Sequence, residues 1–165
     1  MSVIKLQDLK EIAVNSTKLK TPKAPAVDSK KSPTKDSQNR SSATGRRKDA
    51  VARVWIKQGK GECRVNNKPI DQYFVNDGLK SLALYPLKVC GLLGKMDLFC
   101  TVKGGGLSGQ AGSIKHGMSR ALDKFDPELH SLLKSNQLLT RDSRVVERKK
   151  YGQHKARKKT QFSKR

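Results

Sequence analysis

The sequence predicts a small α+β domain with one hydrophobic core, flanked by two basic segments. Three observations lead to this fold class. Ala50, Ala52, Val54 and Ile56 recur with the period of a strand between Val51, Arg53, Trp55 and Lys57, and residues 111–125 repeat apolar side chains at helical spacing. The 165 residues are 35% hydrophobic, which suffices for one modest core.

The positive charge is high and unevenly placed. Lys and Arg number 36 against 14 Asp and Glu, a formal net charge of +22, of which residues 1–48 carry +8, residues 49–140 carry +5 and residues 141–165 carry +9. Such a chain repels itself unless a polyanion supplies counter-charge, so we expect a nucleic-acid partner. We therefore expect a low-complexity, disordered extension over residues 1–43, a globular domain over residues 44–140 and an extended basic tail over residues 141–165.

Residues 1–43 mix Lys, Ser, Thr, Asn and Pro with few large apolar groups beyond the opening stretch. Four apolar residues there can line one side of a short helix: Ile4, Leu6, Leu9 and Ile12. An organellar transit peptide therefore stays open as an interpretation, although Asp8, Glu11 and the use of Lys over Arg weigh against it. No apolar run approaches the roughly 20 residues that span a bilayer, so we expect a soluble protein with no membrane partner.

The pattern of a folded domain starts at Asp49. The alternation predicts a strand over residues 50–57, with Arg53 and Lys57 facing outward. Residues 58–61 (QGKG) predict a turn, and residues 62–65 predict a returning strand that forms a hairpin with the first.

The middle of the sequence predicts one helix and two further strands. A helical region over residues 70–85 is expected to end near Pro86, because the proline ring disfavours a helical residue before it. Residues 87–92 and 96–103 then predict strands on either side of a turn. In the second strand Leu98, Cys100 and Val102 share one face, which we expect to be buried.

The last part of the domain predicts two helices. Apolar residues at helical spacing form a stripe that we expect to pack on the core: Ala111, Ile114, Met118, Ala121, Leu122 and Phe125. Asp126 and Pro127 predict a second helix start, with Asp126 as the N-cap and Pro127 in the first helical position. Beyond Thr140 the chain has too little apolar surface to bury itself, so we expect it to be extended and held by what it binds.

A glycine-rich loop, GGGLSG at residues 104–109, formally satisfies the dinucleotide-binding pattern G-x-G-x-x-G. That fingerprint needs a following parallel strand that supplies an acidic group, whereas this sequence continues into a polar tail. Two interpretations stay open. The loop either brings backbone N–H groups close to a phosphate at a helix N-terminus, or only makes a tight strand-to-helix turn.

The sequence offers no arrangement that is typical of catalysis. Cys63, Cys90 and Cys100 form an odd set without a C-x-x-C pair, which favours a reducing compartment. A zinc site from Cys90, Cys100 and His116 fits no usual ligand spacing. The histidines are scattered and the acidic residues form no recognisable pair, so we expect no enzymatic activity, cofactor, metal or small-molecule substrate.

The C-terminal tail carries the strongest signal for function. Eleven basic residues fall within residues 141–165, interrupted by Tyr151 and Phe162, so phosphate neutralisation is combined with rings on which bases can stack. Fully extended, the tail spans about 80 Å, so the domain can anchor at one place and act at another. Charge alone would also fit a generic DNA-compacting or RNA-chaperone protein, and the glycine loop alone a nucleotide-dependent enzyme.

Four ordered blocks resemble the bacterial-type small-subunit ribosomal protein nine family. They are GRRKDAVARV at residues 45–54, GGGLSGQAGS at 104–113 followed by GMSRAL at 117–122, LTRDSRVVERKKYG at 139–152, and FSKR at 162–165. The resemblance runs from Thr44 to Arg165, about three quarters of the chain, and leaves residues 1–43 unmatched.

This resemblance implies a two-layer α/β sandwich like the second domain of ribosomal protein five, with a left-handed crossover. It also implies a structural constituent of the small-subunit head that binds 3′ major domain rRNA, contacts neighbouring head proteins and reaches the peptidyl-site tRNA with its tail during translation. The implied place is a bacterial ribosome in the cytoplasm, with a mitochondrial ribosome as the alternative.

The resemblance and the basic segments together give a set of expected site residues. Lys164 and Arg165 would meet tRNA phosphates, a backbone common to every tRNA. The residues expected to bind rRNA are Arg46, Arg47, Lys48, Arg53, Gly104, Gly105, Gly106, Ser108, Gly109, Gln110, Lys115, Arg120, Arg141, Arg144, Arg148, Lys149, Lys150, Tyr151, Lys155, Arg157, Lys158 and Lys159.

Overall fold

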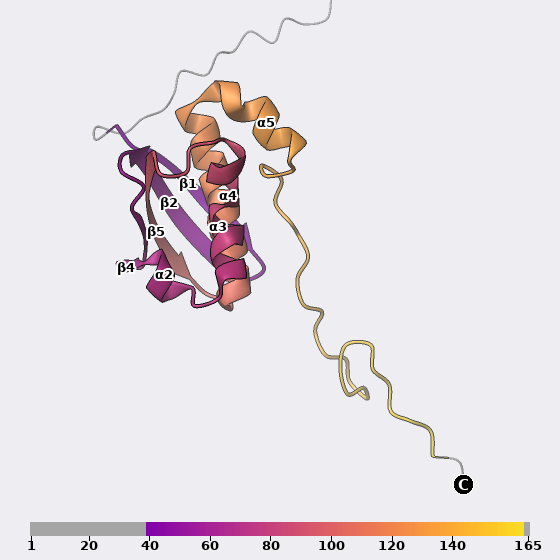
Figure 1. Ribbon diagram of the computed structural model, residues 1–165. Coiled ribbons are helices and arrows are strands. Elements are labelled where there is room, and N and C mark those ends of the chain that lie inside the picture. The colour runs from indigo at the N-terminus through magenta and orange to yellow at the C-terminus, as the bar shows by residue number, and fades with distance from the viewer. Residues whose placement is uncertain (1–38, 164–165) are drawn as a thin grey trace, which may run out of the picture. The chain divides into compact units, whose positions relative to one another are not determined.

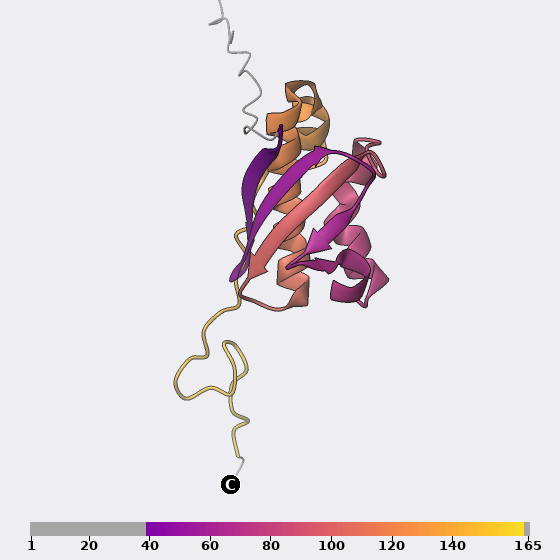
Figure 2. The ribbon, with the colours of Figure 1, turned by 90° about the vertical axis from the view of Figure 1, so that its left-hand side faces the viewer.

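A computed structural model describes residues 39–163 of the chain, and they form the mixed α+β fold that the sequence predicts (Figure 1). A five-stranded sheet carries the long helices on one of its faces, which gives two layers (Figure 2). The interpretations of residues 1–38 and the expected tRNA contacts Lys164 and Arg165 lie outside the described residues. The likeness to ribosomal protein five and the handedness of the crossover stay predictions.

The sheet has the strand order β1-β2-β5-β3-β4. Its strands are β1 (Ser41–Arg47), β2 (Ala50–Gln58), β3 (Cys63–Val65), β4 (Lys68–Pro69) and β5 (Met96–Lys103). β2 pairs antiparallel with both β1 and β5, whereas β3 runs parallel to β5. Parallel neighbours need a crossover, and the helices between β3 and β5 supply it.

The helices are α2 (Ile70–Tyr73), α3 (Asp77–Val89), α4 (Leu107–Phe125), the short 3-10 helix η1 (Pro127–Leu129) and α5 (His130–Ser135). The side chain of Asn76 caps α3 by accepting a hydrogen bond from the N–H of Gly78 at 2.8 Å. The Asp126 side chain caps η1 in the same way, at 3.0 Å from the N–H of Glu128, which confirms the predicted helix start. None of the described helices is both long and apolar enough to cross a membrane.

The predicted hairpin between residues 50–57 and 62–65 is wrong. Residues 63–65 do form a strand, but β1 and β5 occupy both edges of β2, so β3 pairs with β5 instead and places Cys63 opposite Leu98. Strand β1 was not predicted, because its sequence SSATGRR lacks the β-branched and aromatic residues that are typical of strands.

The predicted helix end near Pro86 and the predicted strand over residues 87–92 are also wrong. α3 continues through Pro86 to Val89, and the chain turns at Gly91, whose φ is +66°. Pro86 is buried, and so are Ala83 and Leu87, which are 0% and 1% exposed. Their packing outweighs the hydrogen bond that a proline cannot donate.

The single helical region predicted over residues 70–85 is instead two helices, α2 and α3, separated by residues 74–76, and the other predicted elements are confirmed. β5 covers residues 96–103, and Leu98, Cys100 and Val102 are buried on its inner face. The stripe of α4 lies in the core, apart from Phe125, which is half-buried against it. After Thr140 the described part of the tail contains no helix or strand, only an isolated bridge between Gln153 and Lys159.

The packing of α4 against β1 is unusually close. A Cβ atom on Gly45 would lie 2.0 Å from the carbonyl oxygen of Ser113 and 2.2 Å from the backbone nitrogen of Gly117. A Cβ atom on Gly117 would in turn lie 2.8 Å from Cγ2 of Val54. Helix and strand backbones therefore touch with no side chain between them, which also explains why β1 is built from small residues.

We predict that Gly45→Ala lowers the free energy of unfolding by about 1–3 kcal/mol, because the added methyl group meets backbone atoms that cannot move without shifting α4. Gly109→Ala, one helical turn before Ser113, is the control. Its Cβ would lie 3.6 Å from the Cβ of Ala50, an ordinary van der Waals distance, and alanine favours helix. Denaturant unfolding of both variants tests this, and equal stabilities would contradict the close packing.

Candidate nucleic-acid interface

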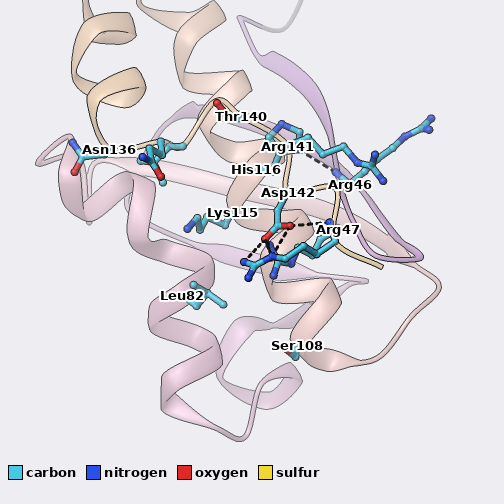
Figure 3. A pocket seen from close by; sticks show the side chains of 14 residues that line it. Arg46, Arg47, Leu82, Ser108, Lys115, His116, Asn136, Thr140, Arg141 and Asp142 are labelled. Carbon is cyan, nitrogen blue, oxygen red and sulfur yellow. Dashed lines mark hydrogen bonds and ion pairs between the residues drawn. The ribbon is translucent and has the colours of Figure 1, made fainter. Parts of the chain in front are cut away.

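Charged side chains gather in a pocket between the end of β1, the first half of α4 and the start of the tail (Figure 3). Its volume is about 760 Å³. Five cationic side chains and one carboxylate line it: Arg46, Arg47, Lys115, Arg141, Arg144 and Asp142. This excess of positive charge in a hollow is suited to a phosphodiester backbone.

Asp142 organises the arginines of this cationic pocket. Its carboxylate accepts hydrogen bonds from the side chain of Arg144, at 2.8 Å from Nη2, and from the backbone N–H of Arg144 at 2.9 Å. It also forms an ion pair with Arg47 (Figure 3). These hydrogen bonds, first those of Arg144 and then that of Arg47, hold the pKa of Asp142 well below its usual range. The base of the tail is thereby tied to the last residue of β1.

The pocket walls depend on the close contact between α4 and β1. The aliphatic part of Arg47 lies across α4 at Gly112, where a Cβ would come within 3.1 Å of Cγ and Cδ. On the other wall the ammonium group of Lys115 lies 5.6 Å from the ring centroid of Tyr85, an arrangement typical of a cation–π contact. Buried Leu138, whose N–H bonds to the carbonyl of Leu133 at 3.0 Å, anchors the chain just before the tail.

A ladder of α4 side chains closes the outer edge of β1. Four residues of helix rise about 6.0 Å and two residues of strand about 6.6 Å, so the two repeats stay in step. The three contacts join Arg46 N–H to His116 Nδ1 at 3.3 Å, Arg120 Nη1 to the Thr44 carbonyl at 2.7 Å, and Lys124 Nζ to the Ser42 carbonyl at 3.0 Å. Three backbone groups at the free edge of β1 are thus satisfied by side chains of α4.

His116 is neutral in this ladder. Its Nδ1 accepts the N–H of Arg46, so the proton of the ring sits on the other nitrogen. Burial lowers the pKa of His116, and the nearby positive charges of Arg120 and Arg141 act in the same direction. The ring serves the fold and adds no charge to the pocket at neutral pH.

The glycines of the 104–109 loop are required by the backbone conformation and by close contacts between backbone atoms. Gly104 and Gly105 have positive φ angles of +76° and +60°, and a Cβ on Gly104 would lie 2.5 Å from the carbonyl oxygen of Asp49. Gln110 braces the loop, because its Nε2 donates to the carbonyl of Gly104 at 3.2 Å and its Oε1 accepts from the hydroxyl of Tyr73 at 2.7 Å. No strand follows α4 in residues 39–163, so the context of a dinucleotide site is missing there.

The other expected site residues divide between domain and tail. Gly106 caps the N-terminus of α4, Ser108 lines the cationic pocket, and Gly109 is buried against Ala50. Lys48 lies exposed in the β1–β2 turn with a φ of +49°, and Arg53 lies exposed on β2. The exposed tail residues are Arg148, Lys149, Lys150, Tyr151, Lys155, Arg157, Lys158 and Lys159.

The tail folds back on itself at one point. Arg157 donates to the carboxylate of Glu147 at 2.9 and 2.5 Å, and the loop between them turns at Gly152, whose φ is +66°. Tyr151 is 94% exposed and Phe162 is 89% exposed, which leaves both rings open to stacking.

Two residues that shape the pocket were not among the expected site residues: Asp142, and His116, which the sequence raised only as part of a zinc site that fits no usual ligand spacing. An acidic residue between Arg141 and Arg144 in an otherwise basic tail was the available signal for Asp142. The three cysteines are free thiols, and burial raises the pKa of Cys63 to about 11 and that of Cys100 to about 12. Within the described residues, His, Cys, Asp and Glu side chains form no group of three that could hold a metal ion.

Comparison with known proteins gives a consistent match. Residues 45–165 match the family described as ribosomal protein S9/S16. The chain is 58% identical over 130 residues to the small ribosomal subunit protein uS9 of Rickettsia canadensis (strain McKiel), covering 79% of this chain and 81% of that protein. Against uS9 of Rickettsia felis (strain ATCC VR-1525 / URRWXCal2) the identity is 59% over 123 residues, covering 74% of this chain and 76% of the relative.

We predict that stability falls in mild acid because of His116. The lowered pKa in the folded state means that the unfolded chain binds more protons below about pH 6.5. The free energy of unfolding is therefore retained above that pH and declines as the pH drops toward the folded pKa. Denaturant unfolding across this range should show the decline in the wild type and in the control His154→Gln, and lose it in His116→Gln. An unchanged slope in His116→Gln would contradict the neutral role.

Proposed function

The chain belongs to the ribosomal protein S9/S16 family, and from that premise we propose that it binds 3′ major domain rRNA in the small-subunit head and reaches the peptidyl-site tRNA with its tail. As a member of this family it is a structural protein of the small ribosomal subunit, within the ribonucleoprotein that carries out translation. A ribosomal role explains both the high positive charge and the glycine loop. The alternatives of a DNA-compacting or RNA-chaperone protein and of a nucleotide-dependent enzyme are therefore not needed to explain them.

The cationic pocket carries the rRNA part of the proposal. Five cations surround a hollow in which Asp142 neutralises only part of their charge. Arg47 and Arg144 are held in place by that carboxylate, so an incoming phosphate meets guanidinium groups whose conformational freedom is already reduced. A neutral partner would leave this charge uncompensated, whereas an RNA backbone compensates it without any base being read.

The tail carries the tRNA part of the proposal. It leaves the domain at the cationic pocket and presents exposed cations and two exposed rings along residues 148–162. Too little apolar surface is available for it to pack on itself, so a surrounding RNA fixes its path. Lys164 and Arg165, at its end, are proposed to meet tRNA phosphates and to hold any tRNA equally, whatever the codon.

We further infer a bacterial ribosome in the cytoplasm as the place of action. The relatives compared above are uS9 proteins of Rickettsia, and a third, from Rickettsia prowazekii (strain Madrid E), is 58% identical over 130 residues. These bacterial relatives favour a bacterial ribosome over the mitochondrial alternative. Neighbouring head proteins are the expected protein partners.

We predict that removing two pocket cations flattens the salt dependence of rRNA binding. In Arg141→Gln/Arg144→Gln, the slope of log affinity against log salt for a 3′ major domain rRNA fragment should become shallower by about 1–2. The reason is that binding with fewer phosphate contacts releases fewer counterions from the RNA. The control Lys88→Gln/Lys95→Gln removes the same charge from exposed positions outside the pocket and should keep the slope. Equal slopes in both double variants would argue against a pocket for RNA.

We also predict that deleting Lys164 and Arg165 weakens peptidyl-site tRNA binding while small subunits still assemble, because the pocket that anchors the domain is untouched. Filter binding of tRNA to reconstituted subunits measures the first effect, and sedimentation measures the second. The exchange Lys164→Arg/Arg165→Lys keeps both charges and should bind tRNA like the wild type. Unchanged tRNA affinity in the deletion would rule out the proposed role of the tail end.

A further inference from the structure

The outer face of the sheet is left open by the described residues. α4 packs on β1 and β2 from one side, where Ala52, Val54 and Ile56 are buried to 1% exposure or less. Figure 2 shows the opposite face of the sheet with the long helices behind it. On β2 this face presents the alternate residues, of which Val51 is 37% exposed and Arg53 is exposed. A sheet face of this kind is available to a partner.

Two aromatic rings stand at the centre of this open face. Trp55 and Phe99 are direct cross-strand partners in the β2–β5 pairing, and both are only half-buried. Arg64 of β3 is the partner of Phe99 on its other side. Aromatic side chains on a pleated surface normally pack against neighbours, so two that keep part of their area in solvent form an accessible stacking platform.

A cation lies over each of the two rings. The guanidinium carbon of Arg53 lies 5.8 Å from the ring centroid of Trp55, and the ammonium nitrogen of Lys57 lies 5.7 Å from that of Phe99. The one acidic residue of β5, Asp97, is 8% exposed, and its carboxylate accepts the N–H groups of Gly61 and Glu62 at 2.9 and 3.0 Å. Lys57 forms an ion pair with Asp97 at 3.8 Å and Arg64 forms one with Glu62 at 3.1 Å. Arg53 forms no ion pair within the described residues, so the positive charge of this face is concentrated beside Trp55.

A hollow of about 220 Å³ adjoins Trp55 at the edge of β1. Its polar lining combines Ser42 and Thr44 with cations from two elements, Arg53 on β2 and the Arg120 and Lys124 pair on α4. The α4 cations are held at the edge by the carbonyl groups of β1, at 2.7 and 3.0 Å. Rings and fixed positive charge therefore lie side by side, as a strand of nucleic acid requires.

We propose that this surface, which we call the Trp55 face, binds an unpaired stretch of RNA whose bases stack on Trp55 and Phe99 while its phosphates lie against Arg53, Lys57 and the cations of the hollow. The occupant is single-stranded because a duplex hides the flat faces of its bases. The proposal rests on the RNA-binding role of the protein and adds a surface separate from the cationic pocket and the tail.

Trp55 is the only tryptophan of the chain, so its fluorescence reports on this face directly. The full chain is titrated with a short fluorescently labelled single strand of RNA, with Trp55 emission and label anisotropy followed together. We expect quenching of Trp55 in step with the anisotropy. A duplex with the same number of phosphates should bind the tail and leave Trp55 unchanged. Binding of the single strand without any Trp55 response, or equal quenching by the duplex, would overturn the proposal.

Matched variants separate this face from the other cations. Trp55→Ala should lower affinity for the single strand about tenfold, and Trp55→Phe should restore it, since a phenyl ring still stacks. Arg53→Gln/Lys57→Gln should reduce the Trp55 quenching several-fold, whereas Lys88→Gln/Lys95→Gln, with the same loss of charge, should not. Arg141→Gln/Arg144→Gln should lower total affinity for RNA but keep the Trp55 response, so failure of the pocket and failure of this face are distinguishable.

A crosslink in the assembled subunit decides between RNA and protein as the occupant. A photoreactive benzoylphenylalanine at position 99 replaces Phe99 in the full chain, and the chain is reconstituted into small subunits before irradiation. We expect adducts on rRNA. Adducts on a neighbouring head protein alone would show that the Trp55 face is a protein interface and would overturn the proposal.

Discussion

The direct contact between the backbones of α4 and β1 is the constraint on which the rest of the structure depends. Gly45 and Gly117 leave no side chain between helix and strand, so α4 lies close enough for its side chains to reach the edge groups of β1. The same approach sets Arg47 against Gly112 and thereby places the end of β1 beside the start of the tail. Fold stability and the position of the cationic pocket consequently arise from one interaction.

Charge is the second constraint, and it is handled differently in the domain and in the tail. In the pocket a single carboxylate, Asp142, holds two arginines in place and leaves the others uncompensated. Along the tail the cations are exposed and only Arg157 has a paired acidic partner, Glu147, among the ion pairs of residues 145–163. An RNA scaffold compensates both parts, the pocket with phosphates at fixed positions and the tail along its path.

The sequence predicted the elements whose side chains carry a clear period, and failed where packing overrides local preference. β2, β5 and α4 follow from alternation and from a helical stripe, and all three lie where they were expected. β1 was not predicted because its small residues are required by the close packing of α4 and have low strand propensity. Residues 87–92 were wrongly predicted as a strand because burial of Leu87 keeps α3 helical past Pro86. The partner of β3 was wrongly predicted because it depends on which edge of the sheet β1 leaves free.

The candidate site was predictable in its charge but not in its geometry. Arg46, Arg47, Lys115, Arg141 and Arg144 were all expected from the sequence, yet nothing in their spacing indicated that one hollow collects them. Gln110 and Arg120 were expected at RNA, which stays a prediction, but the spacing did not indicate that Gln110 also bonds to the glycine loop and Arg120 to the edge of β1. Such roles depend on distances between residues far apart in the chain, which a single sequence does not contain.

The most direct test is arginine footprinting of the cationic pocket in the free protein and in the assembled small subunit. An arginine-specific reagent is applied to both, and mass spectrometry reads the modification of Arg46, Arg141 and Arg144, with exposed Lys88 followed by a lysine reagent as the reference outside the pocket. We expect the pocket arginines to react in the free protein and to be protected in the subunit. Equal reactivity in both states would contradict it.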